Sequence, residues 1–177
     1  MVARILSSLE RAGLADDTII VLWGDNGFHL GEKLHWRKFV LWEEATRVPM
    51  IIVPPASFGP FRPRGTSPVS LIDLFPTLFD LIGLAQPKGL DGESLLPLMR
   101  GTREDRSRPV LSTWHEGNHS LRVGDWRYTQ YSDGGEELYD HDADPYEWNN
   151  LAADERFATV TANCRSTLLS TITPRSS

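Results

Sequence analysis

The stretch that decides the fold is Thr18–Gly27, TIIVLWGDNG, in which a β-branched and apolar run ends in two glycines that flank Asp25 and Asn26. A run that is apolar on both faces is typical of a strand inside a mostly parallel sheet with helices on either side. Ligands of open α/β sheets collect just beyond the carboxyl ends of such strands. The stretch therefore predicts an α/β fold with a functional position at Asp25 and Asn26.

The segments around this stretch extend the α/β pattern. Apolar side chains recur at helical spacing over residues 2–14, and Gly13 is a typical helix end, so we predict a helix there. A second buried strand is predicted at 48–53, and apolar residues at helical spacing over 36–40 predict a helix between the two strands. The order of strand, helix and strand indicates an α/β domain.

A second helix is predicted after a loop. The segment 56–68 is rich in Pro and Gly, which predicts a surface loop. Leucines recur at helical spacing over 71–81, and Pro76 must lie in the first turn of that helix, so the N-cap is expected near Asp73.

The character of the sequence changes beyond Gly101. Short polar and apolar alternations separated by Gly-Asp and Asp-Gly-Gly turns predict an antiparallel meander. The predicted strands are 109–114, 120–123, 126–131 and 137–139, and a helix over 154–172 is expected to cover the sheet. We therefore predict two domains, the α/β part over 1–104 and a small α+β subdomain over 105–177.

Composition excludes several classes of protein. The 177 residues are 40% hydrophobic and 24% charged, which is ordinary for a globular domain, and the formal net charge is −6. A negative charge disfavours nucleic acid and anionic lipid as partners. No apolar run approaches the ~20 residues that cross a bilayer, so we expect no membrane span. One cysteine, Cys164, cannot form an internal disulfide and is expected to be a buried structural thiol.

Two positions after the first strand suggest chemistry. Asp25 and Asn26 together offer two hard oxygen donors, which suit Ca²⁺ or Mg²⁺, although the same residues also form plain turns. Lys38 follows 13 residues after Asp25, and a lysine near a divalent ion can hold the oxygens of a tetrahedral anion. A solvated surface lysine is the alternative.

Two other patterns match known metal motifs but are interpreted as polar turns. Residues 115–119 fit H-E-x-x-H, but their glycine and strand-like flanks disfavour the helix that the motif needs. Residues 140–151 begin like an EF-hand, but Pro145 stands where that loop needs glycine. His115 ends a predicted strand, so it either faces a cleft and contacts a ligand or is an ordinary loop residue.

The run 21–49 resembles the second signature region of the sulfatases, which belong to the alkaline phosphatase superfamily, and is most similar to the iduronate-2-sulfatase-like branch. The matching blocks are Gly24–Gly27, Leu30–Glu32, Trp36 with Lys38, and Ala45–Pro49. Further similar blocks lie at 73–77, 90–95, 121–128 and 137–145. The resemblance covers the chain from its first residue to about residue 151.

The resemblance implies a fold and a set of roles. The chain would be the C-terminal part of an alkaline-phosphatase-like α/β/α sandwich, followed by a small antiparallel β-sheet with a C-terminal helix. Asp25 and Asn26 would ligate Ca²⁺, with Mg²⁺ as the alternative, and Lys38 would contact the substrate sulfate. Phe28 and His29 would line the substrate pocket. The implied activity is hydrolysis of sulfate esters, expected to be those of sulfated sugars, and similar proteins are commonly periplasmic or secreted.

The sequence departs from the family pattern at the nucleophile. Sulfatases use a formylglycine made within a Cys-x-Pro-x-Arg signature, whereas Cys164 is followed by Arg165-Ser166-Thr167-Leu168. The signature and a pair of metal-binding aspartates are expected in a missing N-terminal half of the same fold, which would be the partner of this chain. We therefore expect no sulfatase activity from the chain alone. The alternatives are a non-catalytic truncated fragment, or a phosphoester or phosphonate hydrolase of the same superfamily.

Overall fold

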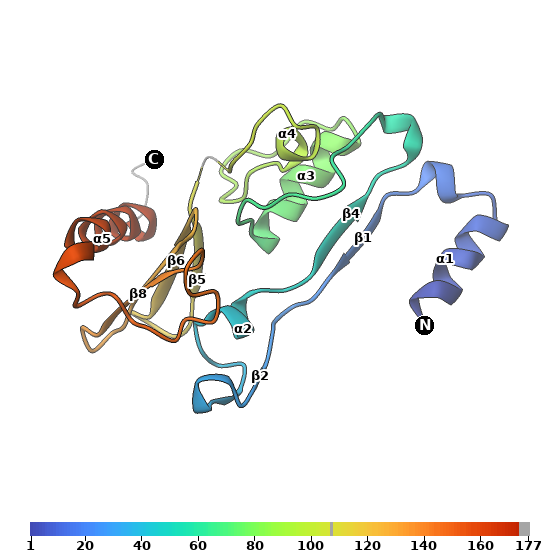
Figure 1. The fold of residues 1–177 in the computed structure, drawn as a ribbon. Helices are drawn as coiled ribbons and strands as arrows, with labels where there is room; N and C mark the ends of the chain where they lie inside the picture. The colour runs from blue at the N-terminus through green and yellow to red at the C-terminus, as the bar shows by residue number, and fades with distance from the viewer. Residues whose placement is uncertain (107, 174–177) are drawn as a thin grey trace. The chain divides into compact units, whose positions relative to one another are not determined.

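The computed structural model describes residues 1–106 and 108–173, and their contacts form two compact units (Figure 1). Unit 1 comprises residues 1–25, 49–65 and 71–104, and unit 2 comprises 26–48, 66–70 and the described residues from 105 onward. The segment 26–48 thus groups with the C-terminal part of the chain. The predicted division into domains 1–104 and 105–177 stays a prediction.

Unit 1 contains a two-stranded sheet formed by β1 (Ile20–Trp23) and β4 (Met50–Val53). Both strands were predicted, and both are confirmed. The strands run antiparallel, with Ile20 opposite Val53, so the expectation of a mostly parallel sheet is wrong for this pair. Parallel neighbours need a crossover connection, usually a helix. The chain between β1 and β4 contains only one four-residue α-helix, α2 (Glu43–Thr46), so it returns antiparallel.

The helices of unit 1 are α1 (Val2–Arg11), α3 (Leu74–Leu81) and α4 (Leu96–Met99). The first two confirm the predicted helices, and α3 begins directly after Asp73, with its proline in the first turn. The buried Asp73 carboxylate accepts a hydrogen bond of 2.9 Å from the backbone N–H of Glu93. This bond ties the start of α3 to the segment that precedes α4.

Unit 2 contains the antiparallel meander that the sequence predicts. Its strands are β5 (Val110–Thr113), β6 (His119–Val123), β7 (Trp126–Gln130) and β8 (Glu136–Asp140), in that order across the sheet. The predicted C-terminal helix is α5 (Ala158–Ile172), which packs on this sheet. Leu121, Tyr128, Leu138, Cys164 and Leu168 form the buried core between the two layers. The expectation that Cys164 is buried is confirmed.

The segment 26–48 of unit 2 forms a short hairpin rather than the predicted helix over 36–40. Strand β2 (His29–Leu30) pairs antiparallel with β3 (Trp36–Arg37). Lys33, in the connection, has a left-handed φ of 53°, and Arg37 has a φ of 134°. Such backbone angles interrupt a right-handed helix, so the helical spacing of the apolar residues was misleading here.

The two motif matches that the sequence disfavoured are turns in the structure. Residues 114–118 connect β5 to β6, and His119 is already in β6, so the H-E-x-x-H residues do not lie on a helix. The segment that resembles the start of an EF-hand follows β8 as a turn. None of the helices in the described part of the chain is long and apolar enough to cross a bilayer.

Candidate functional site

The candidate site is carried by the chain that leaves β1, where two glycines shape the backbone. Gly24 donates its backbone N–H to Pro49 O at 3.0 Å within unit 1. In unit 2, Gly27 donates its N–H to Ala45 O at 2.9 Å. A Cβ atom on Gly27 would lie 1.9 Å from Glu44 O, so a larger residue does not fit at this position. The second glycine of the sequence motif, Gly27, therefore has a steric cause.

Asn26 and Lys38 lie side by side in unit 2. Lys38 Nζ donates a hydrogen bond of 2.8 Å to Asn26 Oδ1, and the lysine is exposed. Asn26 Nδ2 in turn donates to Gly27 O at 2.8 Å, which fixes the orientation of the amide. The two positions that the sequence singled out 12 residues apart are thus brought together. Asp25, the residue before Asn26, is exposed at the end of unit 1.

Phe28 and His29 follow directly, and their environments differ. Phe28 is exposed, whereas His29 is 1% exposed and packs edge-on against His35 and Trp42, with ring centroids at 5.3 and 5.8 Å. His29 Nδ1 lies 3.3 Å from Glu32 O. In this chain His29 therefore contacts other side chains instead of solvent. The substrate-lining roles assigned to both residues stay predictions.

His115 lies in the turn between β5 and β6, with its ring against that of Trp114. Its backbone has a left-handed φ of 57°, and its ring centroid is 3.9 Å from that of Trp114. Trp114 is in turn 6.2 Å from Phe39, measured between ring centroids. Because Phe39 follows Lys38 in the chain, the structure brings His115 close to the segment that carries the predicted sulfate-binding lysine.

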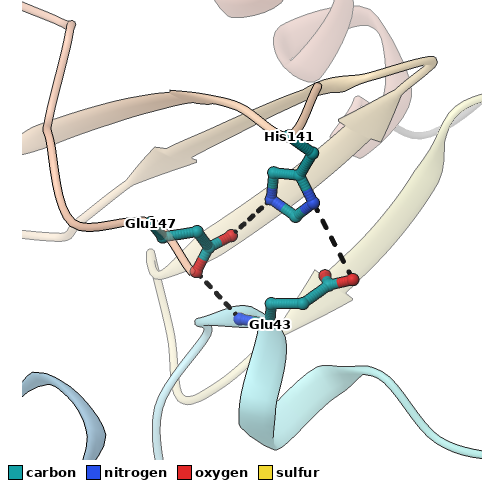
Figure 2. Close-up of side chains that lie close together, drawn as sticks. All are labelled: Glu43, His141 and Glu147. Carbon is teal, nitrogen blue, oxygen red and sulfur yellow. Dashed lines mark hydrogen bonds and ion pairs between the residues drawn. The ribbon is translucent and has the colours of Figure 1, made fainter. Parts of the chain in front are cut away.

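A buried ionic cluster, which the sequence did not predict, lies where segment 26–48 meets the sheet of unit 2. Glu43, His141 and Glu147 converge in it (Figure 2). His141 Nε2 is 2.7 Å from Glu147 Oε1 and His141 Nδ1 is 3.8 Å from Glu43 Oε1. The backbone N–H of Glu43 donates to Glu147 Oε2 at 2.9 Å. The cluster therefore links α2 to the turn after β8.

Arg127 completes this ionic cluster from β7. Its guanidinium forms ion pairs with Glu43 and with Glu147, the latter at 2.5 Å, and it also donates to Leu41 O at 3.1 Å. Burial raises the pKa of Glu147, but the hydrogen bond from His141 and the charge of Arg127 outweigh burial and hold that pKa below its ordinary value. Glu147 is thus an anion with cationic and N–H partners.

The ligand atoms of Glu43, His141 and Glu147 lie within 4.8 Å of one another, a spacing that a metal ion could also use. The guanidinium of Arg127 already contacts both carboxylates. A cation bound there would be repelled by this fixed positive charge. The arrangement is therefore best explained as a buried salt-bridge network that holds α2 against the sheet.

Lys33 and Trp42 add further links between segment 26–48 and the sheet. Lys33 Nζ donates to Tyr139 OH at 3.1 Å and lies 4.6 Å from the Trp42 ring centroid. Burial lowers the pKa of Lys33. Trp42 Nε1 donates to Glu137 Oε2 at 2.8 Å. Contacts of Lys33 and Trp42 with β8 thus hold the segment in place on both sides of Lys38, which is itself exposed.

The sequence contained one signal for the buried network. Arg127 lies between Trp126 and Tyr128 in a predicted strand. A charged residue therefore stands in the middle of a strand that contributes to the core. An arginine in a predicted strand beside buried positions needs an acidic partner. The partners could not be identified in advance, because Glu43 lies 84 residues before Arg127.

Comparison with known proteins gives consistent matches. A family model named Sulfatase matches residues 1–84. A sulfatase of Formosa agariphila is 38% identical over 157 residues, which cover 87% of this chain and 30% of the relative. A protein solved in complex with its substrate D-glucosamine-2-N,6-O-disulfate superposes with a TM-score of 0.83 at 28% identity, covering 96% of this chain and 37% of that one.

A further solved structure, the phosphonate monoester hydrolase of Agrobacterium radiobacter, superposes with a TM-score of 0.79 at 26% identity. It covers 96% of this chain and 38% of that one. The present chain therefore spans about a third of the length of the proteins that it matches.

Proposed function

Because this chain belongs to the sulfatase family of the alkaline phosphatase superfamily, we propose that it contributes one side of an active site that hydrolyses the sulfate esters of sugars. The observation that carries the proposal is the hydrogen bond of 2.8 Å between Lys38 Nζ and Asn26 Oδ1. This bond joins the Lys38 ammonium, which can bind a sulfate oxygen, to the Asn26 amide oxygen, which can ligate a metal ion. The saccharide substrate of a solved relative supports the choice of sugar.

Lys38 and Asn26 would act together on the sulfate group. The Lys38 ammonium is exposed and preoriented by the Asn26 amide, so it can meet a sulfate oxygen without reorganising. Preorganised positive charge stabilises the negative charge that develops on the transferring group. Lys38 therefore binds the sulfate in the ground state and stabilises it further in the transition state.

Asp25 and Asn26 are proposed to hold a divalent cation. A carboxylate and an amide oxygen are hard donors that fit Ca²⁺, with Mg²⁺ as the alternative. When bound, such an ion supplies Lewis-acid charge at the sulfate oxygens. Two protein ligands fall short of the six to eight oxygens that Ca²⁺ takes, so we propose that a partner segment provides the others.

The nucleophile is also proposed to come from the partner, the remaining N-terminal part of the same fold. These 177 residues contain no Cys-x-Pro-x-Arg run. Cys164 is no substitute, because it is buried in the core of unit 2 and burial raises the pKa of its thiol. We therefore expect the formylglycine to lie outside these 177 residues.

A chimera tests the proposal. We would replace the aligned region of the Formosa agariphila sulfatase with this chain and measure the turnover of a sulfated monosaccharide. Lys38→Ala is expected to lower kcat/KM about 100-fold, the usual effect of losing a preorganised charge-stabilising donor. Lys88→Ala, at another exposed lysine, is the matched control and should leave turnover unchanged.

Two results would contradict the proposal. Equal activity of Lys38→Ala and Lys88→Ala would remove Lys38 from the site. Faster turnover of a phosphonate monoester than of the sulfate ester would favour the phosphonate hydrolase alternative, which the Agrobacterium radiobacter structure supports. The chain alone is expected to be inactive, and turnover that survives Cys164→Ala but is lost in Lys38→Ala would overturn that expectation.

A further inference from the structure

Two exposed aromatic side chains, one of them next to Lys38 in the sequence, lie close together in unit 2. Phe39 is 53% exposed and Trp114 is 39% exposed. Their ring centroids are 6.2 Å apart and their planes are tilted by 36°, so the two rings are neighbours on the surface. Large exposed aromatic groups that lie together are unusual on a protein surface and mark interaction sites.

The turn that carries Trp114 is held in place. Trp114 donates its backbone N–H to Asn118 O at 3.1 Å, and Asn118 Oδ1 accepts the backbone N–H of Ser132 at 3.2 Å. Gly117 has a φ of 77°, and a Cβ atom there would lie 2.9 Å from Ser132 Cβ. The backbone that carries Trp114 is therefore held in place by hydrogen bonds and packing within the turn.

His115 adds a polar group at the edge of the aromatic surface. Its φ of 57° is uncommon for a residue other than glycine, and such backbone conformations cluster at binding sites. The imidazole lies against Trp114 at 69°, with ring centroids 3.9 Å apart. A ring nitrogen at this edge can exchange a hydrogen bond with a hydroxyl group.

These features match the chemistry of a sugar. One face of a pyranose ring carries C–H groups that pack on aromatic rings, while its rim carries hydroxyl groups. We propose that Phe39, Trp114 and His115 form a platform that binds the pyranose ring of a sulfated saccharide while Lys38 holds its sulfate. This inference rests on the proposed function and names the substrate part that the chain recognises.

The surface suits a sulfated sugar better than a quaternary ammonium ester such as choline sulfate. An ammonium group is bound by aromatic rings that enclose it as a cage. Phe39 and Trp114 instead form an open surface, and the 3.9 Å contact leaves no room between Trp114 and His115. Arg37, exposed beside Lys38, adds positive charge that complements a sulfate.

Saturation-transfer NMR on the full 177-residue chain tests the platform. The probes are N-acetylglucosamine 6-sulfate and choline sulfate, each titrated to give a Kd. Trp114→Ala is expected to raise the Kd of the sulfated sugar about tenfold, because stacking on one aromatic ring contributes about a factor of ten to affinity. The same substitution should leave the Kd of choline sulfate unchanged. Trp114→Phe should restore most of the sugar affinity. Trp148→Ala, at another exposed tryptophan of unit 2, is the matched control.

The two proposals fail in different ways in this experiment. Lys38→Ala should weaken both sulfate esters, and no effect on either would contradict the proposed function. If Lys38→Ala weakens both but Trp114→Ala weakens neither, only the platform is wrong. Loss of choline sulfate binding in Trp114→Ala, or absence of sugar signals with the unmodified chain, would also overturn the platform, the second result indicating that another part of the protein covers this surface.

Discussion

The two larger sheets of this chain use similar side chains but bury them very differently. In unit 1, neither β1 nor β4 contributes a fully buried side chain, and Leu22 is 38% exposed. In unit 2, Leu121 and Leu138 are 0% exposed beneath α5. The difference teaches that an apolar strand becomes core only when a second layer covers it. In unit 2 that layer is α5.

This contrast predicts unequal stability. Full burial of a leucine stabilises a fold by about 1.5–3 kcal/mol, which the strands of unit 1 largely forgo. We propose that the missing N-terminal part of the fold covers β1 and β4. In the chain alone, amide protons of β7 and β8 should therefore exchange more slowly than those of β1 and β4.

The largest change is expected from Arg127→Ala. Removing the guanidinium takes away the buried cation that pairs with both Glu43 and Glu147. Breaking a buried ion pair from one side costs about 3–5 kcal/mol. Amide exchange measured by mass spectrometry should speed up accordingly in β7 and β8 and stay unchanged in β1 and β4.

The matched control for Arg127→Ala is Arg156→Ala, because the Arg156 ion pair with Asp154 is exposed. That substitution should change the free energy of opening, measured by amide exchange, by less than about 1 kcal/mol. An equal effect of both substitutions would show that the ionic cluster does not stabilise the sheet.

A somewhat smaller effect is expected from truncating one leucine in each sheet. Leu138→Ala removes a fully buried side chain and should lower the free energy of unfolding of unit 2 by about 3 kcal/mol. Leu22→Ala, in β1, should cost less than about 1 kcal/mol, because that side chain already contacts solvent. Amide exchange in increasing urea measures both costs, through the amides of β7 and β8 for unit 2 and those of β1 and β4 for unit 1. Equal costs at the two positions would contradict the comparison.

Local sequence signals predicted elements well where a single segment decides the outcome. The helix that begins after Asp73 was placed by Pro76, and the meander of unit 2 was found from alternation and turn residues. The predicted helix over 36–40 was wrong, because Arg37 has a φ of 134° and pairs in β3, and residue spacing does not reveal backbone angles. The direction of β4 relative to β1 depends on the whole connection, which no local pattern encodes.

The candidate site shows the same limit. Asn26 and Lys38 were singled out by a motif whose members are close in sequence, and the structure brings them together. The ionic cluster joins Glu43 to Glu147, 104 residues later, and its members are unremarkable charged residues in the sequence. Phe39 and Trp114 likewise meet only in the folded chain. Pairings across such distances depend on packing and could not be predicted from one sequence.

The smallest effect on stability is expected from lowering the pH. Protonation of a carboxylate removes its charge but does not remove the side chain from its packing. The pKa of Glu147 is held below its ordinary value, against burial, by His141 and Arg127, and the pKa of Glu136 is lowered chiefly by a hydrogen bond from Arg165. The unfolded chain therefore binds these protons at higher pH than the folded chain does. The stability that the two carboxylates contribute is present above about pH 4.5 and is lost as pH falls further.

Unit 1 should respond less to acid than unit 2. Arg62 also lowers the pKa of Glu104, but that pair lies at the surface and solvent screens it. Amide exchange between pH 6 and pH 3.5, corrected for intrinsic rates, should therefore show β7 and β8 losing protection more than β1 and β4. Glu147→Gln should reduce the loss of protection that β7 and β8 show at low pH. Glu155→Gln, at an exposed carboxylate, should leave that loss unchanged. An unchanged acid response in Glu147→Gln would mean that the buried network is not the group that titrates.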